Sequence, residues 1–177
     1  DLFRLFAPEV VFLSPIEAEL AKLFTNSYRY IQFAVANQFY MIASSSNVDY
    51  YKVLEGMKHN YPRSKDFPIA GLSAGPCLFK DTMQLAAFYR NQFGLGFDAM
   101  LINEGMPQFI VDRLAVSCNL PEITVGLLGM AFKAESDDPR FSLSYKLKKI
   151  LVGRCKEILT TDPFVKSDYD KDLLPLD

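Results

Sequence analysis

Hydrophobic residues fill most of the stretch from Ser14 to about Ser44, and nothing in it breaks a helical pattern. At its start, Ser14 can cap a helix, Pro15 suits the first helical position and Glu17 completes a capping box. The pattern predicts one helix of about 30 residues, or about 45 Å at the rise of an α-helix. That length is unusual in a globular protein and suggests an element shared between domains or subunits.

The polar side chains of this helix gather on one side. At about 100° per residue, five of them fall within a sector of about 80°. They are Glu19, Lys22, Asn26, Arg29 and Asn37. Such a stripe is either the solvated edge of the helix or a row of groups directed into a site. The pattern by itself favours the solvated edge, yet two asparagines and one lysine solvate a helix poorly compared with the usual mixture of glutamate and lysine.

Shorter patterns predict the elements on either side of the long helix. Residues 9–13 are expected to form a short strand or an extended lead-in, and Asn47 to cap a second helix over 48–58. Residues 59–80 lack periodicity, and a loop of that length in a compact domain is usually functional or disordered; we interpret this one as functional. A third helix is predicted over 81–93, and Gly94-Leu95-Gly96 is expected to end it. A fourth is predicted over 97–117, with an interruption or kink near Gly105-Met106-Pro107.

The pattern changes near residue 120. An apolar run over 122–130 that ends in glycines is typical of a buried parallel strand. A loop over 132–140, a basic amphipathic helix over 142–155 and a strand over 157–161 follow, which predicts a βαβ unit with ligand-facing loops after its strands. Gly126-Leu127-Leu128-Gly129 matches a dinucleotide-binding fingerprint only loosely. Because two parallel strands do not make a stable sheet alone, we expect a truncated α/β domain here.

Composition excludes several classes of protein. The net charge of −2 is spread without long runs of one sign, which argues against a nucleic-acid groove and against a basic membrane patch. No apolar run is long enough to cross a membrane, and the start of the chain lacks a signal-peptide pattern. Three scattered cysteines and a single histidine, His59, form neither a disulfide framework nor a metal site. We therefore expect a cytoplasmic protein without a bound metal.

One stretch, residues 70–82, concentrates the candidate chemistry. Small residues lead into Cys77, and Lys80 and Asp81 follow it within one helical turn. A thiol at the start of a helix meets unpaired amide groups, which favour the thiolate. The alternative is a small structural cysteine in a glycine-rich turn.

Three motifs, in this order, give the chain a resemblance to a known family. They are residues 18–26 together with Asn37, then Gly75-Pro76-Cys77-Leu78-Phe79-Lys80-Asp81, then Gly129-Met130-Ala131-Phe132-Lys133 through Asp137-Asp138-Pro139-Arg140. Residues 161–165 resemble the family segment that follows the next strand. With these motifs the chain resembles the UDP-glucose/GDP-mannose dehydrogenase family.

The resemblance implies a four-electron oxidation of a nucleotide sugar by NAD through a cysteine thioester. Cys77 would be the nucleophile, Lys22 and Asn26 would stabilise and position the oxyanion, and Asp81 would orient or activate water. The substrate would be bound by Phe132, Lys133, Lys80 and Arg63, with Arg63 reaching the substrate of a partner subunit. Arg140 would face the cofactor. UDP-glucose is the substrate expected first; GDP-mannose and UDP-N-acetylhexosamines are the alternatives within the family.

The resemblance also implies a domain organisation. Residues 1–13 would be the lead-in from an N-terminal NAD-binding domain, 14–119 a central helical dimerisation domain that carries the cysteine, and 120–177 part of a C-terminal nucleotide-sugar-binding domain. The expected fold is mainly α, followed by the first βαβ unit of a truncated Rossmann-like domain. A homodimer would form through the long helix. The alternative function is a helical dimerisation module without chemistry of its own.

Overall fold

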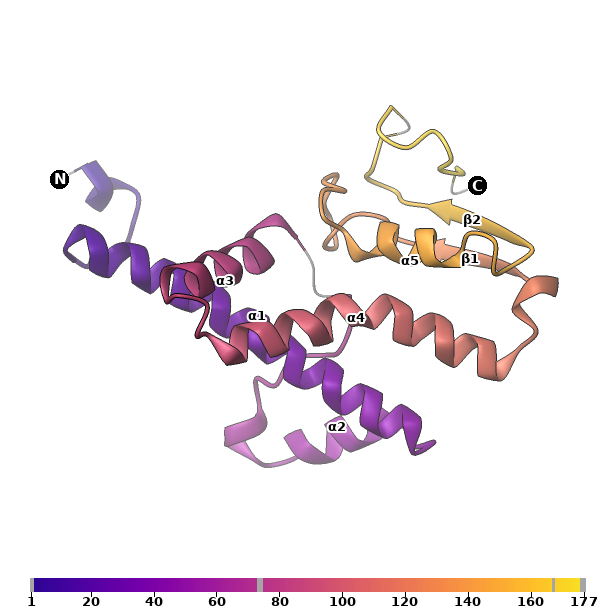
Figure 1. Cartoon of the computed structure of the whole chain (residues 1–177). Helices are drawn as coiled ribbons and strands as arrows, with labels where there is room; N and C mark the ends of the chain where they lie inside the picture. Colours follow the sequence, from indigo (N-terminus) through magenta and orange to yellow (C-terminus); the bar gives the residue numbers. More distant parts are fainter. Residues whose placement is uncertain (1, 73–74, 167, 176–177) are drawn as a thin grey trace.

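A computed structural model describes residues 2–72, 75–166 and 168–175. Its longest element is α1, Pro15–Ser45, which runs through the helical part of the molecule and packs against α3, Pro76–Phe88, and α4, Gly94–Ser117 (Figure 1). The capping box is present, since the Glu17 carboxylate accepts the Ser14 backbone N–H at 2.8 Å. The mainly α fold and the long helix are therefore confirmed.

The helices meet in a core centred on the middle of α1. Tyr30 and Ala34 of α1 are buried against Leu78 of α3 and Ala99 of α4. Burial of this apolar surface stabilises the three-helix arrangement more than helix propensity does. The core thus holds the N-terminal turn of α3, which begins with Pro76 and Cys77, against one side of α1.

Three predicted boundaries are wrong. Asp49, whose carboxylate accepts backbone N–H groups of the first turn, caps α2, Tyr50–Lys58; Asn47 instead has a left-handed φ of 55°. The third helix begins at Pro76 and ends at Phe88, about five residues earlier than its pattern predicts at each end. The fourth helix begins at Gly94, inside the glycine stretch expected to end the third helix, and it is not interrupted at Pro107, because Met106, Pro107 and Val111 are buried and their packing outweighs the missing hydrogen bond of the proline.

The C-terminal part contains the expected βαβ unit. Strand β1, Thr124–Leu128, pairs in parallel with β2, Glu157–Thr161, and α5, Leu143–Leu151, joins them. Helix α5 ends four residues before its predicted end, and Gly153, with a φ of 75°, turns the chain toward β2.

One core joins this unit to α4. Val111 of α4 packs with Leu127 of β1 and with Leu147 and Leu151 of α5. The helical and α/β parts are therefore in direct contact, and the domain boundary at residue 119 stays a prediction.

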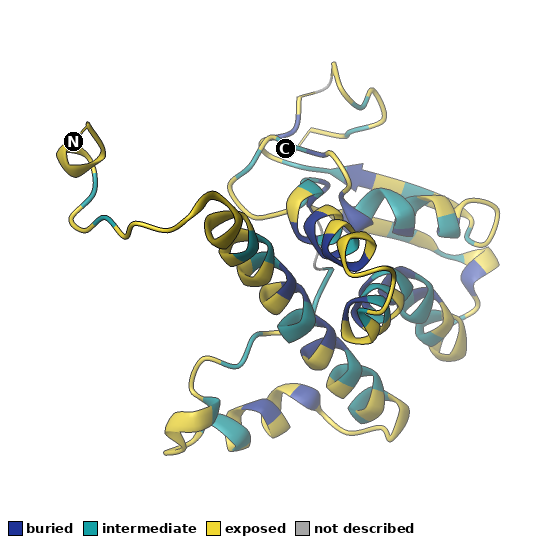
Figure 2. Cartoon of the chain, turned by 60° about the vertical axis from the view of Figure 1, so that its left-hand side comes forward, coloured by how far each residue is buried: buried dark blue, intermediate teal, exposed yellow. Residues whose placement is uncertain are grey.

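Two short segments carry much exposed apolar surface. Residues 9–13, expected as a strand or an extended lead-in, have no regular secondary structure, and the 3-10 helix Leu2–Leu5 precedes them. One side of α1 is also exposed along much of its length (Figure 2).

Within the part of the chain that the structure describes, no helix is both long and apolar enough to cross a membrane.

Candidate active site

Cys77 is the second residue of α3 and its side chain is exposed. Gly75 precedes the helix with a φ of 115°, a conformation that favours glycine, and Pro76 occupies the first helical position. The thiol therefore lies at a helix N-terminus, where unpaired amides favour an anion. The expectation that Cys77 lies at or near the start of a helix is confirmed, whereas Ser73 and Ala74 of the small-residue stretch lie outside the described residues.

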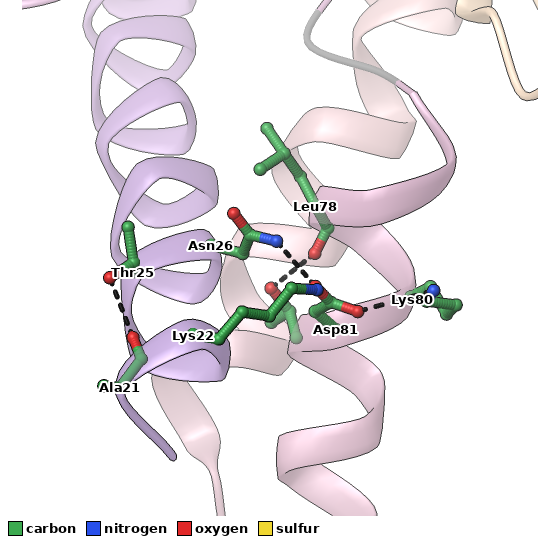
Figure 3. Close-up of polar contacts among 8 residues, drawn as sticks. Ala21, Lys22, Thr25, Asn26, Leu78, Lys80 and Asp81 are labelled. Carbon is green, nitrogen blue, oxygen red and sulfur yellow. Dashed lines mark hydrogen bonds and ion pairs between the residues drawn. The ribbon is translucent and has the colours of Figure 1, made fainter. Parts of the chain in front are cut away.

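Asp81, one turn after Cys77 on the same helix, is the centre of a polar cluster (Figure 3). Its carboxylate accepts hydrogen bonds from Lys22 Nζ and, at 2.6 Å, from Asn26 Nδ2. Lys80 Nζ lies 3.6 Å from the other carboxylate oxygen. The structure thus brings four of the predicted site residues into one contact network between α1 and α3.

The protonation of Asp81 follows from this network. The carboxyl is almost fully buried, with 2% of its side chain exposed, and burial alone would raise its pKa. Hydrogen bonds from Lys22 and Asn26, with the charges of Lys22 and Lys80, outweigh burial and lower the pKa below its usual value of 3.8. Asp81 is therefore a carboxylate at neutral pH, and its low basicity makes it a weak proton acceptor.

A cavity of about 440 Å³ opens beside Cys77. Its walls come from α1, from the loop before α3 together with the first turn of α3, and from the turn after β1. The lining residues are Asn26, Arg29, Phe33, Ile69, Gly71, Leu72, Gly75, Pro76, Cys77, Leu78, Phe132 and Lys133. Parts of the three motifs, far apart in the sequence, therefore meet at one cavity.

Phe132 and Lys133 reach this cavity from a turn that Asp162 holds in place. The Asp162 carboxylate accepts the backbone N–H groups of Met130 and Ala131 at 2.7 and 2.9 Å, and two further N–H groups at Phe164 and Val165. Burial raises the pKa of Asp162, but these hydrogen bonds outweigh it and lower the pKa. The sequence analysis missed this role, although an aspartate directly after a parallel strand is the signal that could have revealed it.

Arg140 forms a two-pronged ion pair with Asp138 in the loop before α5. Its Nε and Nη2 donate to the two Asp138 oxygens at 2.9 and 2.8 Å. These bonds lower the pKa of Asp138 to about 2, and they raise the pKa of Arg140, to which Cys77 adds a smaller contribution. The exposed guanidinium is therefore held by Asp138 and lies within electrostatic range of the thiol.

Arg63 is not part of this site. It lies in the 3-10 segment Pro62–Ser64 and lines a separate cavity of about 410 Å³ with Tyr28 and Val35 of α1. Lys80 is 64% exposed and reaches the cluster only through its ion pair with Asp81. The structure thus separates Arg63 from the cavity beside Cys77 within one copy of the chain.

The polar stripe on α1 is not simply a solvated edge. Asn26 faces Asp81, and Asn37 is fully buried, where it contacts Asn103 of α4 and the backbone of Gly71. Glu19 and Arg29, by contrast, are exposed. The solvated-edge interpretation is therefore wrong for the asparagines, and Asn103 is a polar residue that the pattern on its own helix did not reveal.

Comparisons with known proteins agree on one family. The model of the UDP-glucose/GDP-mannose dehydrogenase family, central domain, matches residues 16–105. A UDP-N-acetyl-D-mannosamine dehydrogenase of Pyrococcus horikoshii is 34% identical in an alignment of 176 positions that covers 96% of this chain and 42% of that protein. A UDP-glucose 6-dehydrogenase of Haloferax volcanii is 31% identical in an alignment of 163 positions that covers 88% of this chain and 37% of that protein.

Solved structures show the same similarity. The structure of the P. horikoshii UDP-D-ManNAc dehydrogenase superposes with a TM-score of 0.82 at 32% identity, covering 93% of this chain and 41% of that one. A UDP-glucose dehydrogenase from Pyrobaculum islandicum gives a TM-score of 0.76 at 27% identity, with 93% and 40% coverage. The chain thus spans about two fifths of the length of the relatives that it matches.

Proposed function

Because the chain belongs to the UDP-glucose/GDP-mannose dehydrogenase family, we propose that it forms the central part of an NAD-dependent nucleotide-sugar dehydrogenase in which Cys77 is the nucleophile. The observation that carries the proposal is the cavity where Cys77, Asn26 and Lys133 meet. A cysteine at a helix N-terminus, beside an open cavity and a row of amide and cationic groups, suits covalent catalysis on a carbonyl carbon.

In the proposed reaction the sugar 6-hydroxyl is oxidised in two steps, to an aldehyde and then to a carboxylate. The Cys77 thiolate attacks the aldehyde carbon, forming a C–S bond while the carbonyl electron pair moves to oxygen. Loss of a hydride from that carbon turns the thiohemiacetal into a thioester. Water then displaces the thiol, and the products are the carboxylate and free Cys77. Each oxidation removes one hydride, which carries two electrons, and one proton, so two NAD molecules are reduced for each sugar.

The cluster around Asp81 supports the oxyanion. The Lys22 ammonium and the Asn26 amide can each donate to the developing negative charge, and neither needs to reorganise, since Asp81 already holds both. The lowered pKa of Asp81 supports an orienting role over that of a proton-accepting base. We therefore assign Asp81 to the positioning of Lys22, Asn26 and the hydrolytic water.

NAD, when bound, supplies the hydride acceptor. Arg140 would contact a cofactor phosphate through the exposed guanidinium N–H groups that do not bond Asp138, since only Nε and one N–H of Nη2 are used in that ion pair. The turn at Gly129 offers no such site, since Asp162 already accepts the N–H groups of Met130 and Ala131. We therefore predict that the 177-residue chain by itself transfers no hydride, and hydride transfer to NAD by this chain alone would contradict that.

The proposed substrate is a UDP-linked sugar, with Phe132 and Lys133 at its binding cavity. The sequence analysis placed UDP-glucose first. The P. horikoshii relative, named for UDP-N-acetyl-D-mannosamine, has both higher identity and higher coverage than the H. volcanii relative named for UDP-glucose. We therefore propose a UDP-N-acetylhexosamine first and UDP-glucose as the alternative.

The test uses the full-length enzyme that contains this segment. With UDP-N-acetyl-D-mannosamine or UDP-glucose, the wild type should reduce two NAD molecules per sugar, and mass spectrometry should find the acyl adduct on the Cys77 peptide. Cys77→Ser should stop carboxylate formation, whereas Cys118→Ser and Cys155→Ser, both away from the cavity, should leave it unchanged. Carboxylate production by Cys77→Ser at the wild-type rate would rule out the covalent mechanism.

A second role, dimerisation, is favoured by the outer face of α1. Large apolar side chains there are exposed at spacings of three, four and seven residues, which places them on one side of the helix. They are Phe24, Tyr28, Val35, Phe39 and Ile42. We propose that two copies pair through this face. Arg63 lies beside it, with Tyr28 and Val35, so that pairing would bring Arg63 to the subunit interface, as its expected reach into a partner subunit requires.

A further inference from the structure

Asn37 is buried in the middle of a hydrogen-bond chain that links three segments. Its Oδ1 accepts the backbone N–H of Gly71 at 2.8 Å, and its Nδ2 donates to Asn103 Oδ1 at 2.8 Å. Asn103 Nδ2 in turn donates to the Tyr30 carbonyl at 3.0 Å. Both asparagine side chains are fully buried. The chain therefore joins the loop before Cys77 to α1 and α4.

The ends of this chain determine the orientation of both amides. A backbone N–H only donates and a backbone carbonyl only accepts, so Gly71 requires the oxygen of Asn37 and Tyr30 requires the amide nitrogen of Asn103. A flip of either amide would face donor with donor or acceptor with acceptor. The network thus has a single satisfied arrangement, and that arrangement places the acceptor of Asn37 at Gly71.

Asn37 lies 11 residues, or about three turns, after Asn26, and therefore on the same side of α1. Asn26 holds Asp81, and Asn37 holds Gly71. The segment between these contacts contains Cys77, and its residues Gly71, Leu72 and Gly75 line the cavity. Two amides on one helix face thus fasten the segment that carries the thiol at both of its ends.

We propose that Asn37 is a positioning residue that holds Gly71 and Leu72, in the wall of the cavity beside Cys77, where they receive the nucleotide sugar. This inference rests on the proposed function. Asn37 acts through the backbone of Gly71, and Asn103 orients Asn37. Because α3 is held separately through Asp81, loss of Asn37 should release Gly71 from α1 and weaken substrate binding while leaving the thiol on its helix.

Three variants distinguish a positioning role of Asn37 at Gly71 from a purely structural role of the Asn37–Asn103 pair. Asn37→Leu and Asn103→Leu each leave a buried amide without a partner, so each should destabilise the fold. Asn37→Leu/Asn103→Leu removes both amides and should recover stability relative to the single variants. The loop anchor is absent from Asn37→Leu and from the double variant, but its acceptor is kept in Asn103→Leu.

The first measurement is hydrogen exchange of the Gly71 amide in the 177-residue chain, alongside chemical denaturation. We expect exchange at Gly71 to be about tenfold faster or more in the double variant than in the wild type, at similar global stability. Exchange in Asn103→Leu should stay closer to the wild type once its lower stability is taken into account. Unchanged exchange at Gly71 in the folded double variant would overturn the anchoring role.

The second measurement is steady-state kinetics of the full-length enzyme with the nucleotide sugar. The double variant should raise KM about five- to tenfold and change kcat less than about twofold. Equal KM values in the double variant and the wild type would overturn the positioning role. A wild-type enzyme that oxidises no nucleotide sugar would instead contradict the proposed function, and the exchange experiment would still decide whether Asn37 anchors the loop.

Discussion

Gly75 packs its backbone against the ring of Phe132, so closely that a Cβ at Gly75 would lie 2.7 Å from Phe132 Cδ2. This contact joins the loop before Cys77 to the turn after β1, and both residues line the cavity beside Cys77. The absence of a side chain at residue 75 therefore decides how the two halves of the cavity meet.

Gly75→Ala should lower the free energy of unfolding by about 1–3 kcal/mol, because alanine is strained at a φ of 115°. It should also displace the Phe132 ring and weaken binding of the nucleotide sugar. Chemical denaturation and ligand titration measure the two effects. Gly56→Ala in α2 is the matched control, since a Cβ there meets nothing within 4 Å and should be neutral or stabilising. Equal stability of the wild type and Gly75→Ala would contradict this prediction.

Asp81→Asn should destabilise the fold by about 1–3 kcal/mol at pH 7, because it weakens the contacts to Lys22 and Asn26. The folded pKa of Asp81 lies below its usual value of 3.8, so the carboxylate contributes its full stability above about pH 3.8. That contribution is lost as the pH falls through the folded pKa. Denaturation curves should therefore show a constant difference down to about pH 4 that narrows below it.

Glu19→Gln is the control for Asp81→Asn, because Glu19 is exposed and lies on the same face of α1 as Lys22 and Asn26. It should shift the free energy of unfolding by less than about 0.5 kcal/mol. A difference between wild type and Asp81→Asn that widens below pH 4 would show that the folded pKa of Asp81 is raised, contrary to the prediction.

Arg140→Gln should raise the pKa of Asp138 from about 2 toward its usual value of 3.8, since the guanidinium supplies most of the hydrogen bonding and charge that lower it. Carbon-13 NMR titration of the carboxyl group measures the change. Lys133→Gln removes only a smaller charge contribution and should move the pKa less. A larger shift in Lys133→Gln than in Arg140→Gln would contradict the ion pair seen here.

Ile42→Glu should weaken the proposed dimer about tenfold or more, because it would bury an unpaired charge in an apolar interface. Sedimentation velocity at low micromolar concentration measures association. Glu19→Lys, on the polar stripe of α1, should leave association unchanged. A wild-type chain that sediments as a clean monomer would remove the basis for pairing through α1.

Local signals were enough to predict much of the secondary structure. The capping box at Ser14 forms between residues three apart, and the local patterns of α1 and of the strand Glu157–Thr161 predicted these elements as the structure has them. The start of α3 was missed, because Pro76 and the small residues before it suggested a loop, whereas burial of Leu78 and Asp81 against α1 extends the helix to Pro76.

The sequence by itself predicted Cys77, Asp81 and Phe132 as residues of the candidate site, since the three motifs contain them, but it also placed Arg63 there and gave no role to Asp162. Only the tertiary structure decided what each one contacts. Lys22 and Asn26 meet Asp81 across 59 and 55 residues, and Asn37 meets Asn103 across 66. The physical reason is that such contacts form only when α1, α3 and α4 share a core, and helical periodicity reports which face is apolar without reporting which neighbour covers the polar one.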